Sequence, residues 1–305
     1  MKLNLLLSLI FFVFYSQADE DRRISGGEVA FLGQFPHHAH IKIYFETFFI
    51  ICGGSLVKHN WVVTAAHCVS NFEYRYIEVL LGLVNRNDQP EYLLRVENRD
   101  HVRYHPLYDP PDNLSNDIAL IYLEDAEPSI LSNPYVGKID LPVGIVSDFV
   151  GYQVTATGFG ITNDSDPNPS ETLNFVSMPV ISNEECITRL PSEIITSETF
   201  CTNTIDERST CPGDNGGGAF TTIESRRILI GIASLYVDQC QIGVPAIFTR
   251  VTEFINWLEE NFDNPPEIEI PLPTLPPSQD GCNCECICET CPNIQLQNRK
   301  KNKEL

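Results

Sequence analysis

Three short segments of the chain hold the residue types that acid–base and nucleophilic chemistry use. They read Thr64-Ala65-Ala66-His67-Cys68, Asn116-Asp117-Ile118-Ala119-Leu120 and Cys211-Pro212-Gly213-Asp214-Asn215-Gly216-Gly217. Each segment alone is weak evidence. A histidine beside a cysteine is more often structural than catalytic, and an aspartate before an apolar run is usually a cap or turn residue. What the segments can do together depends on the elements that position them.

Those elements read as short strands. Between residues 24 and 262, apolar runs recur between clusters of Gly, Pro, Asn and Asp, a rhythm typical of an all-β barrel or sandwich. Near residue 255 the apolar spacing changes to that of a helix with one buried face. The strand runs are residues 40–44, 61–66, 118–123, 150–157 and 228–235, and the helical face holds Val251, Phe254, Ile255 and Leu258.

The charge balance argues against two classes of partner. The 305 residues include 41 acidic and 20 basic side chains, a formal net charge of −21. Binding nucleic acid or an anionic membrane surface usually needs a basic patch. We therefore expect a protein partner, with no nucleic acid and no membrane.

The chain divides into five regions. Residues 1–18 contain Lys2, then an apolar run, and end in a small residue, Ala18. The apolar run is shorter than the roughly 20 residues that a membrane span needs. This pattern predicts a signal peptide and a secreted, extracellular protein. Residues 19–23 form a short pro-segment and residues 24–262 the main domain. Residues 263–280 hold six prolines and predict a semi-rigid linker. Residues 281–305 form a cysteine-rich, basic tail.

In their order and spacing, the three segments resemble the trypsin/chymotrypsin-like serine proteases, and the resemblance extends over nearly all of residues 24–262. It implies two packed six-stranded antiparallel β-barrels with the active cleft between them and a C-terminal helix. His67 matches the family's general base and Asp117 the carboxylate that orients it. The backbone N–H groups of Gly213 and Asn215 match the donors that stabilise the oxyanion.

The nucleophile position of the family, however, holds Asn215 in place of serine. An amide is a poor nucleophile that an imidazole cannot usefully deprotonate, and loss of the serine alone costs on the order of 10⁶ in kcat where it has been measured. Thr210 and Thr221 lie too far along the chain to share the turn that supplies the oxyanion donors. The sequence therefore predicts a catalytically inactive homologue in which His67 and Asp117 are triad remnants.

The substrate-pocket positions depart from the family as well. Ser209 stands at the pocket base, as in chymotrypsin-like members that prefer apolar side chains, and Tyr236 and Ala246 stand where the walls are usually glycine. A tyrosine ring there is expected to narrow the pocket, which Ser234 also lines. Gly218 replaces a proline that the family usually has. Several departures at one site favour a lost activity.

The resemblance also implies processing and cross-links. Arg23-Ile24-Ser25-Gly26-Gly27 resembles an activation site, where a cut after Arg23 would free the Ile24 amino group to pair with Asp214. Neither a metal nor a cofactor is expected. The implied disulfides are Cys52–Cys68, Cys186–Cys201 and Cys211–Cys240.

Two further features are independent of the family. Asn113 and Asn163 each begin an Asn-X-Ser pattern and are expected to carry N-linked glycans. Five cysteines between positions 282 and 291 leave at least one unpaired within the tail. In an oxidising compartment, disulfides between chains are favoured over a soft-metal site, which would need thiolates.

Three functions follow from these observations. The leading hypothesis is a secreted, inactive serine protease homologue that acts by protein binding, as a regulator, decoy or cofactor of proteases or their targets. One alternative is an active chymotrypsin-like serine endopeptidase with an atypical site. The other is a protein whose tail acts by cross-linking or by metal binding.

Overall fold

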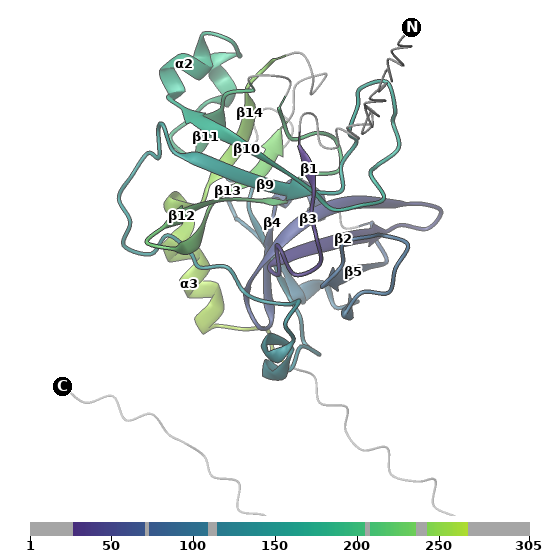
Figure 1. Ribbon diagram of the computed structural model, residues 1–305. Coiled ribbons are helices and arrows are strands. Elements are labelled where there is room, and N and C mark those ends of the chain that lie inside the picture. The colour runs from purple at the N-terminus through teal and green to yellow at the C-terminus, as the bar shows by residue number, and fades with distance from the viewer. Residues whose placement is uncertain (1–26, 71–72, 109–114, 205–207, 236–242, 268–305) are drawn as a thin grey trace, which may run out of the picture. The chain divides into compact units, whose positions relative to one another are not determined.

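The computed structural model describes residues 27–70, 73–108, 115–204, 208–235 and 243–267, and within them the chain forms two antiparallel β-sheets of seven strands each (Figure 1). The first sheet has the order β6-β5-β2-β3-β4-β8-β7. Its strands are β2 (His38–Tyr44), β3 (Phe49–Lys58), β4 (Trp61–Thr64), β5 (Tyr76–Leu81), β6 (Tyr92–Val96), β7 (Val102–Tyr104) and β8 (Ala119–Tyr122).

The second sheet closes on itself. Its order is β1-β10-β11-β14-β13-β12-β9, and a further pairing of β9 with β10 makes a six-stranded barrel to which β1 is added. Its strands are β1 (Glu28–Val29), β9 (Gln153–Gly158), β10 (Asn174–Ile181), β11 (Thr199–Thr202), β12 (Gly218–Ile223), β13 (Arg226–Leu235) and β14 (Ala246–Arg250).

The predicted all-β class with two barrels is confirmed, with one refinement. In the described ranges the first sheet is curled rather than closed, because its edge strands β6 and β7 do not pair with each other. Each of the five predicted strand runs overlaps an observed strand, namely β2, β4, β8, β9 and β13.

Helices are few and short. The predicted C-terminal helix begins with a 3₁₀ turn, η5 (Val251–Phe254), and continues as α3 (Ile255–Asp263). None of the helices in the described ranges is long and apolar enough to cross a membrane. The others are α1 (Ala66–Val69), α2 (Asn183–Ile187), η1 (Arg99–His101), η2 (Pro128–Ser132) and η3 (Ser192–Ile194).

Each sheet has an apolar core. In the closed barrel Phe200 and Phe248 stack with ring centroids 5.3 Å apart, beside buried Met178. In the first sheet Trp61 is fully buried and contacts Phe262 of α3 with ring centroids 5.8 Å apart. These contacts bury the apolar face of α3 against the first sheet although the helix follows the last strand of the second.

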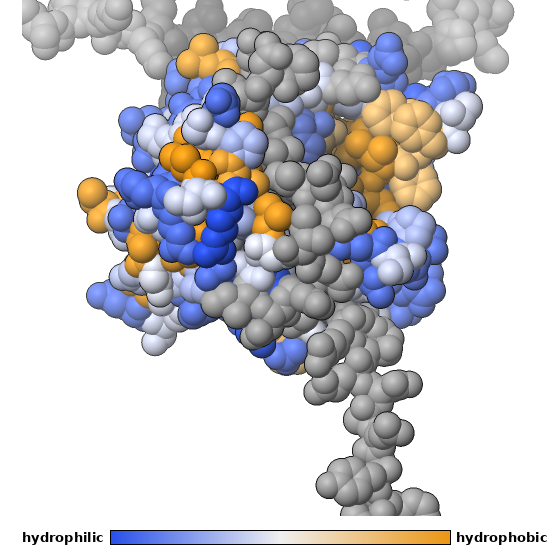
Figure 2. Space-filling model, turned by 90° about the horizontal axis from the view of Figure 1, so that it is seen from above, coloured by the Kyte–Doolittle hydropathy of each residue, from blue (hydrophilic) through white to orange (hydrophobic). Residues whose placement is uncertain are grey.

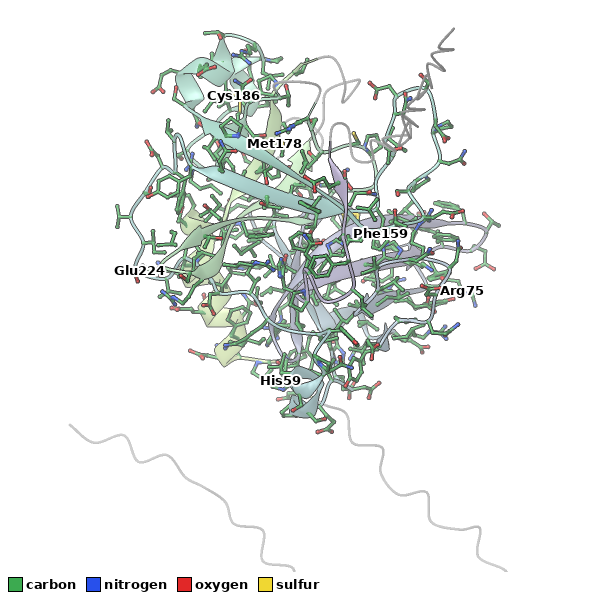
Figure 3. All side chains as sticks on the ribbon, in the orientation of Figure 1. His59, Arg75, Phe159, Met178, Cys186 and Glu224 are labelled. Atoms are coloured by element: carbon green, nitrogen blue, oxygen red, sulfur yellow. A yellow bond between two sulfur atoms is a disulfide. The ribbon has the colours of Figure 1, made fainter. Side chains whose placement is uncertain are left out.

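Three buried histidines lie where strand β2 meets the second sheet. The Nδ1 atom of His38 lies 2.9 Å from Oγ1 of Thr157, and the ring centroid of His40 lies 4.7 Å from that of Phe159, a residue labelled in Figure 3. His37 packs against a phenylalanine of β12. The Nε2 atoms of all three have no hydrogen-bond partner. Burial lowers the pKa of His37 and of His38 to about 3, so both side chains are neutral at physiological pH.

Candidate active site

His67 and Asp117 reach each other from two segments that adjoin strands of the first sheet. Strand β4 ends at Thr64 and leads directly into the single-turn helix α1, which carries His67. Asp117 precedes strand β8 and follows Asn116, whose φ of 58° lies in the left-handed region that asparagine tolerates better than most residues. The Asn116 side chain donates to Leu107 O at 3.1 Å, which holds this bend.

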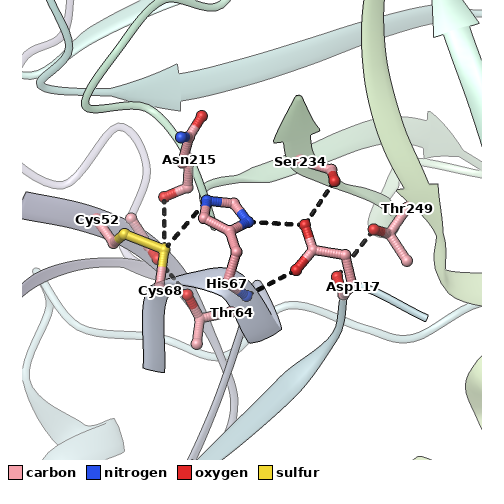
Figure 4. Close-up of polar contacts among 9 residues, drawn as sticks. Cys52, Thr64, His67, Cys68, Asp117, Asn215, Ser234 and Thr249 are labelled. Carbon is pink, nitrogen blue, oxygen red and sulfur yellow. Dashed lines mark hydrogen bonds and ion pairs between the residues drawn. A yellow bond between two sulfur atoms is a disulfide. The ribbon is translucent and has the colours of Figure 1, made fainter. Parts of the chain in front are cut away.

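The Asp117 carboxylate is buried and accepts three hydrogen bonds. The Nδ1 atom of His67 lies 2.8 Å from Asp117 Oδ2, and the His67 backbone N–H donates to Oδ1 at 2.8 Å (Figure 4). Ser234, on β13 of the second sheet, donates its hydroxyl to Oδ2 at 2.5 Å. This network fixes the ring orientation of His67 with Nδ1 as the protonated nitrogen.

Asn215 lies on the other side of the imidazole. Its backbone carbonyl accepts the Gly53 N–H at 2.7 Å, and the sulfur of Cys68 lies 3.8 Å from that carbonyl oxygen and 3.7 Å from His67 Nε2. The Asn215 amide group points away from the imidazole ring (Figure 4), and no hydrogen bond joins the two side chains. The structure therefore brings His67, Asp117 and Asn215 close together, as the sequence predicted.

Close packing of glycines positions the Asn215 turn. A Cβ atom added to Gly53 would lie 2.7 Å from the Gly217 Cα atom, so strand β3 and the turn can approach only where both residues lack a side chain. Gly213 and Gly216 have φ values of +96° and +79°, a region that favours glycine. The glycine-rich sequence of this turn is thus explained by its contact with the first sheet.

Asp214, between Gly213 and Asn215, points into the protein. It is buried and accepts hydrogen bonds from Gly160 N–H at 2.8 Å and Cys211 N–H at 2.9 Å. Burial raises its pKa to about 7, while the two hydrogen bonds act in the opposite direction. Arg23 and Ile24, its predicted activation partners, lie outside the described residues.

The predicted pocket residues are placed only in part. Ser209 is buried and its hydroxyl donates to Thr210 O at 3.0 Å, and Ala246 is buried at the start of β14. Tyr236 lies outside the described residues. Ser234, which was predicted as a pocket residue, also contacts the His67–Asp117 pair, because its hydroxyl donates to Asp117.

The cysteine predictions are confirmed for two pairs. The disulfides Cys52–Cys68 and Cys186–Cys201 are formed. Cys211 is also disulfide-bonded, whereas Cys240 lies outside the described residues. The sulfurs of Cys52 and Cys68 and a ring nitrogen of His67 lie within 4.8 Å of one another. Because a metal needs thiolates and these sulfurs are bonded to each other, this group does not make a metal site.

Of the two predicted glycosylation positions and the tail, only Asn163 lies in the part of the chain that the structure describes. Asn163 is exposed and its side chain accepts the Ser165 N–H at 2.8 Å in a loop. Asn113 and the tail cysteines lie outside the described residues. Glycosylation of Asn163 stays a prediction, made on an accessible side chain.

Sequence reasoning missed one residue of the site. Thr249, on β14, donates its hydroxyl to the Asp117 backbone carbonyl at 2.9 Å and so anchors the aspartate loop to the second sheet. A threonine within a strand carries no sequence signal for such a role, since the residue type is common in strands.

Comparison with known proteins agrees with this geometry. The Trypsin family model matches residues 24–258 of the chain. Collagenase of Hypoderma lineatum is 31% identical over 243 residues, covering 78% of this chain and 87% of the relative, and brachyurin of Leptuca pugilator is 32% identical over 240 residues, covering 77% and 97%. The solved structure titled HL collagenase superposes with a TM-score of 0.69 at 30% identity, covering 79% of this chain and 99% of that one. The chain therefore belongs to the trypsin family, whose members are serine endopeptidases.

Proposed function

We propose that this protein is a member of the family that binds polypeptides without cleaving them. The observation that supports the proposal is Asn215, which the sequence resemblance aligns with the family's serine nucleophile and which lies near the hydrogen-bonded His67–Asp117 pair. A protein that keeps the base and its orienting carboxylate but lacks the nucleophile retains the shape of the site. It is expected to lose a factor on the order of 10⁶ in kcat. The role is then that of a regulator, decoy or cofactor of proteases or of their targets.

Four hydroxyl groups of the surrounding segments support this proposal because they are engaged elsewhere. Thr64 donates to Gly53 O at 2.8 Å, Ser209 to Thr210 O, and Ser234 to Asp117. Thr221 donates to Gln153 O at 2.9 Å. A hydroxyl must be free to lose its proton to His67 before it can act as a nucleophile.

An exposed apolar cluster at the β2–β3 hairpin supports a protein partner. Phe48, Phe49 and Ile50 are 57%, 48% and 37% exposed, and Figure 2 shows apolar side chains gathered at the right edge, the side to which the β2–β3 hairpin projects in Figure 1. At about 3.3 Å per strand residue, Ile50 lies roughly 7 Å along the strand from Cys52, whose disulfide adjoins His67. Exposed aromatic patches are a feature of protein-binding surfaces.

Secretion and activation belong to the same proposal. The predicted signal peptide places the protein outside the cell, and the predicted cut between Arg23 and Ile24 supplies an amino group for Asp214. Buried Asp214 has no ion-pair partner among the described residues, which supports a role for such a group.

The test measures binding and turnover on one sample. The full chain is cleaved after Arg23, its new N-terminus is verified by sequencing, and it is incubated with peptides that have apolar residues before the scissile bond. The proposal predicts saturable binding with no new peptide ends by mass spectrometry. Catalytic turnover, retained after removal of contaminating proteases, would contradict it and establish the alternative of an active chymotrypsin-like endopeptidase. The intact geometry of His67 and Asp117 favours that alternative, so this assay is the one that separates the two.

A further inference from the structure

The turn that carries Asn215 presents two backbone donors without acceptors. Asp214 N–H donates to Cys211 O at 3.0 Å, and Gly216 N–H donates to Ala233 O at 2.7 Å. In the described ranges the N–H groups of Gly213 and Asn215 donate to no acceptor, and both residues are half-buried. Two N–H groups without a protein acceptor on one rigid turn are available to donate to a ligand oxygen.

The imidazole of His67 completes one side of this place. Its Nδ1 proton is directed at Asp117, so Nε2 is the nitrogen that faces a ligand, and the side chain is 23% exposed. In the neutral ring Nε2 is an acceptor, and in the protonated ring it is a charged donor. A ligand that offers only acceptors is therefore bound by the protonated ring.

Asn215 changes the set of donors available to a ligand. A serine hydroxyl would supply one proton, which the neutral histidine would take in a hydrogen bond. The Asn215 amide supplies two N–H donors, makes no side-chain hydrogen bond in the described part of the protein, and points away from the ring (Figure 4). Two backbone N–H groups, the N–H groups of a nearby amide and, when the ring is protonated, the imidazole Nε2–H are the donors that this region can offer to a ligand.

From this donor set we infer that the site binds the C-terminal carboxylate of a polypeptide, such as a chain end that another endopeptidase has released, in preference to an internal peptide bond. The inference rests on the proposed binding function. A carboxylate has two oxygens, accepts several hydrogen bonds and donates none, which matches these groups. Capture of a terminal carboxylate by free backbone N–H groups is a known mode of peptide recognition.

The charges around the site require that a proton accompany the carboxylate. Asp117 is the charged group bonded to the His67 ring, and a second carboxylate near it is compatible with the ring only in the protonated form. Tyr108, near Asp117, has its pKa raised to about 12 by burial and by the negative charge of Asp117, so it stays neutral. Asp214 is turned away and bonded to Gly160 and Cys211. Binding of the carboxylate is therefore expected to favour the protonated form of the ring over the neutral form.

Isothermal titration calorimetry on the full chain cleaved after Arg23 tests the inference with three peptides. They are acetyl-Ala-Ala-Pro-Phe with a free carboxylate, the same peptide as its C-terminal amide, and a longer peptide in which Phe is followed by Ala-Ala-amide. We expect the carboxylate to bind about tenfold to a hundredfold more tightly than the other two, the range for hydrogen bonds to a charged group. The binding enthalpy should vary with the buffer's ionisation enthalpy, with the sign of proton uptake.

Variants separate the amide of Asn215 from general effects. Asn215→Ala should lower the affinity for the free carboxylate about tenfold and leave that of the amide peptide unchanged, while Asn168→Ala, at an exposed loop position, should change neither. Equal binding of all three peptides, no binding of the carboxylate at millimolar concentration, or no proton uptake would overturn the inference. Equal binding without cleavage would leave the proposed binding function standing, whereas cleavage of the longer peptide would overturn that function instead.

Discussion

The Gly53 N–H lies 2.7 Å from the Asn215 carbonyl oxygen, and this hydrogen bond joins strand β3 of the first sheet to the turn that precedes β12 of the second. Ser234 and Thr249 cross in the opposite direction, from β13 and β14 to Asp117. The site is thus held by polar contacts from both sheets. Its geometry depends on their close approach.

The first prediction concerns that approach. Gly53→Ala should destabilise the protein by about 1–3 kcal/mol, because the added Cβ would lie 2.7 Å from Gly217 Cα and 2.8 Å from Gly217 N. Gly137→Ala is the matched control, since its Cβ would meet only side-chain atoms of Pro36 at 3.4 Å. Urea unfolding measures both. Equal stabilities of the two variants would contradict this prediction, because they would show that the added methyl group fits between strand β3 and the turn.

The second prediction concerns acid stability. His37 and His38 have pKa values lowered by burial to about 3, and that of His40 is lowered well below 6.5. The folded state therefore binds fewer protons than the unfolded state below pH 6.5, and each histidine costs about 1.4 kcal/mol of stability per pH unit as the pH falls toward 3. Asp214 acts oppositely: its raised pKa makes stability fall as pH rises from about 4 to 7. With three histidines against one carboxyl group, we expect a net loss of roughly 2 kcal/mol per unit of acidification between pH 6 and pH 5.

Urea unfolding at pH 7, 6 and 5 gives this dependence directly. The variant His38→Gln should flatten it, because an amide can still bond to Thr157 but takes up no proton. His59→Gln, at a half-buried histidine in the turn between β3 and β4, should leave the slope as it is in the natural protein. A stability that does not change between pH 7 and 5 would mean that the folded protein accommodates the charged histidines.

The third prediction concerns Asp214. At pH 8 its carboxyl group is mainly ionised, and a cut after Arg23 should raise Tm by several degrees as the new amino group of Ile24 pairs with it, at about 2–4 °C for each kcal/mol. Asp214→Asn should lose this gain, and Asp88→Asn, at an exposed carboxylate, should keep it. Differential scanning calorimetry of cut and uncut protein measures the gain, and an equal gain for all three chains would contradict the pairing.

The fourth prediction concerns the tail. Five cysteines cannot all pair within one chain, so the full chain should run as disulfide-linked oligomers on non-reducing electrophoresis. A chain ending at Glu267 lacks the five tail cysteines and should therefore run as a monomer. It keeps the two described disulfides and the hydrogen bond from Arg103 to Asn264 O at 2.6 Å. A monomeric full chain would remove cross-linking as a function of the tail.

The sequence predicted the central residues of the site but not the residues that hold them in place. The motifs around His67, Asp117 and Asn215 were sufficient to predict that these residues meet. The bond from Ser234 to Asp117 spans 117 positions, and pairing over such a distance leaves no local pattern. His40 begins one of the predicted strand runs and His38 lies just before it, yet nothing in one sequence indicates that both imidazoles are buried. The open first sheet is likewise decided by edge pairing, which residue types do not specify.

Labelling with a fluorophosphonate, which reacts only with an activated nucleophile, tests the central claim about Asn215 most directly. The account predicts no label on the natural protein cleaved after Arg23, and a label on Asn215→Ser, because His67 and Asp117 already stand 2.8 Å apart and would activate the new hydroxyl. Adding Asp117→Asn to that variant should slow its labelling by a factor on the order of 10⁴. A label on the natural protein that maps to the cleft would show that it has a working nucleophile, and would contradict the account.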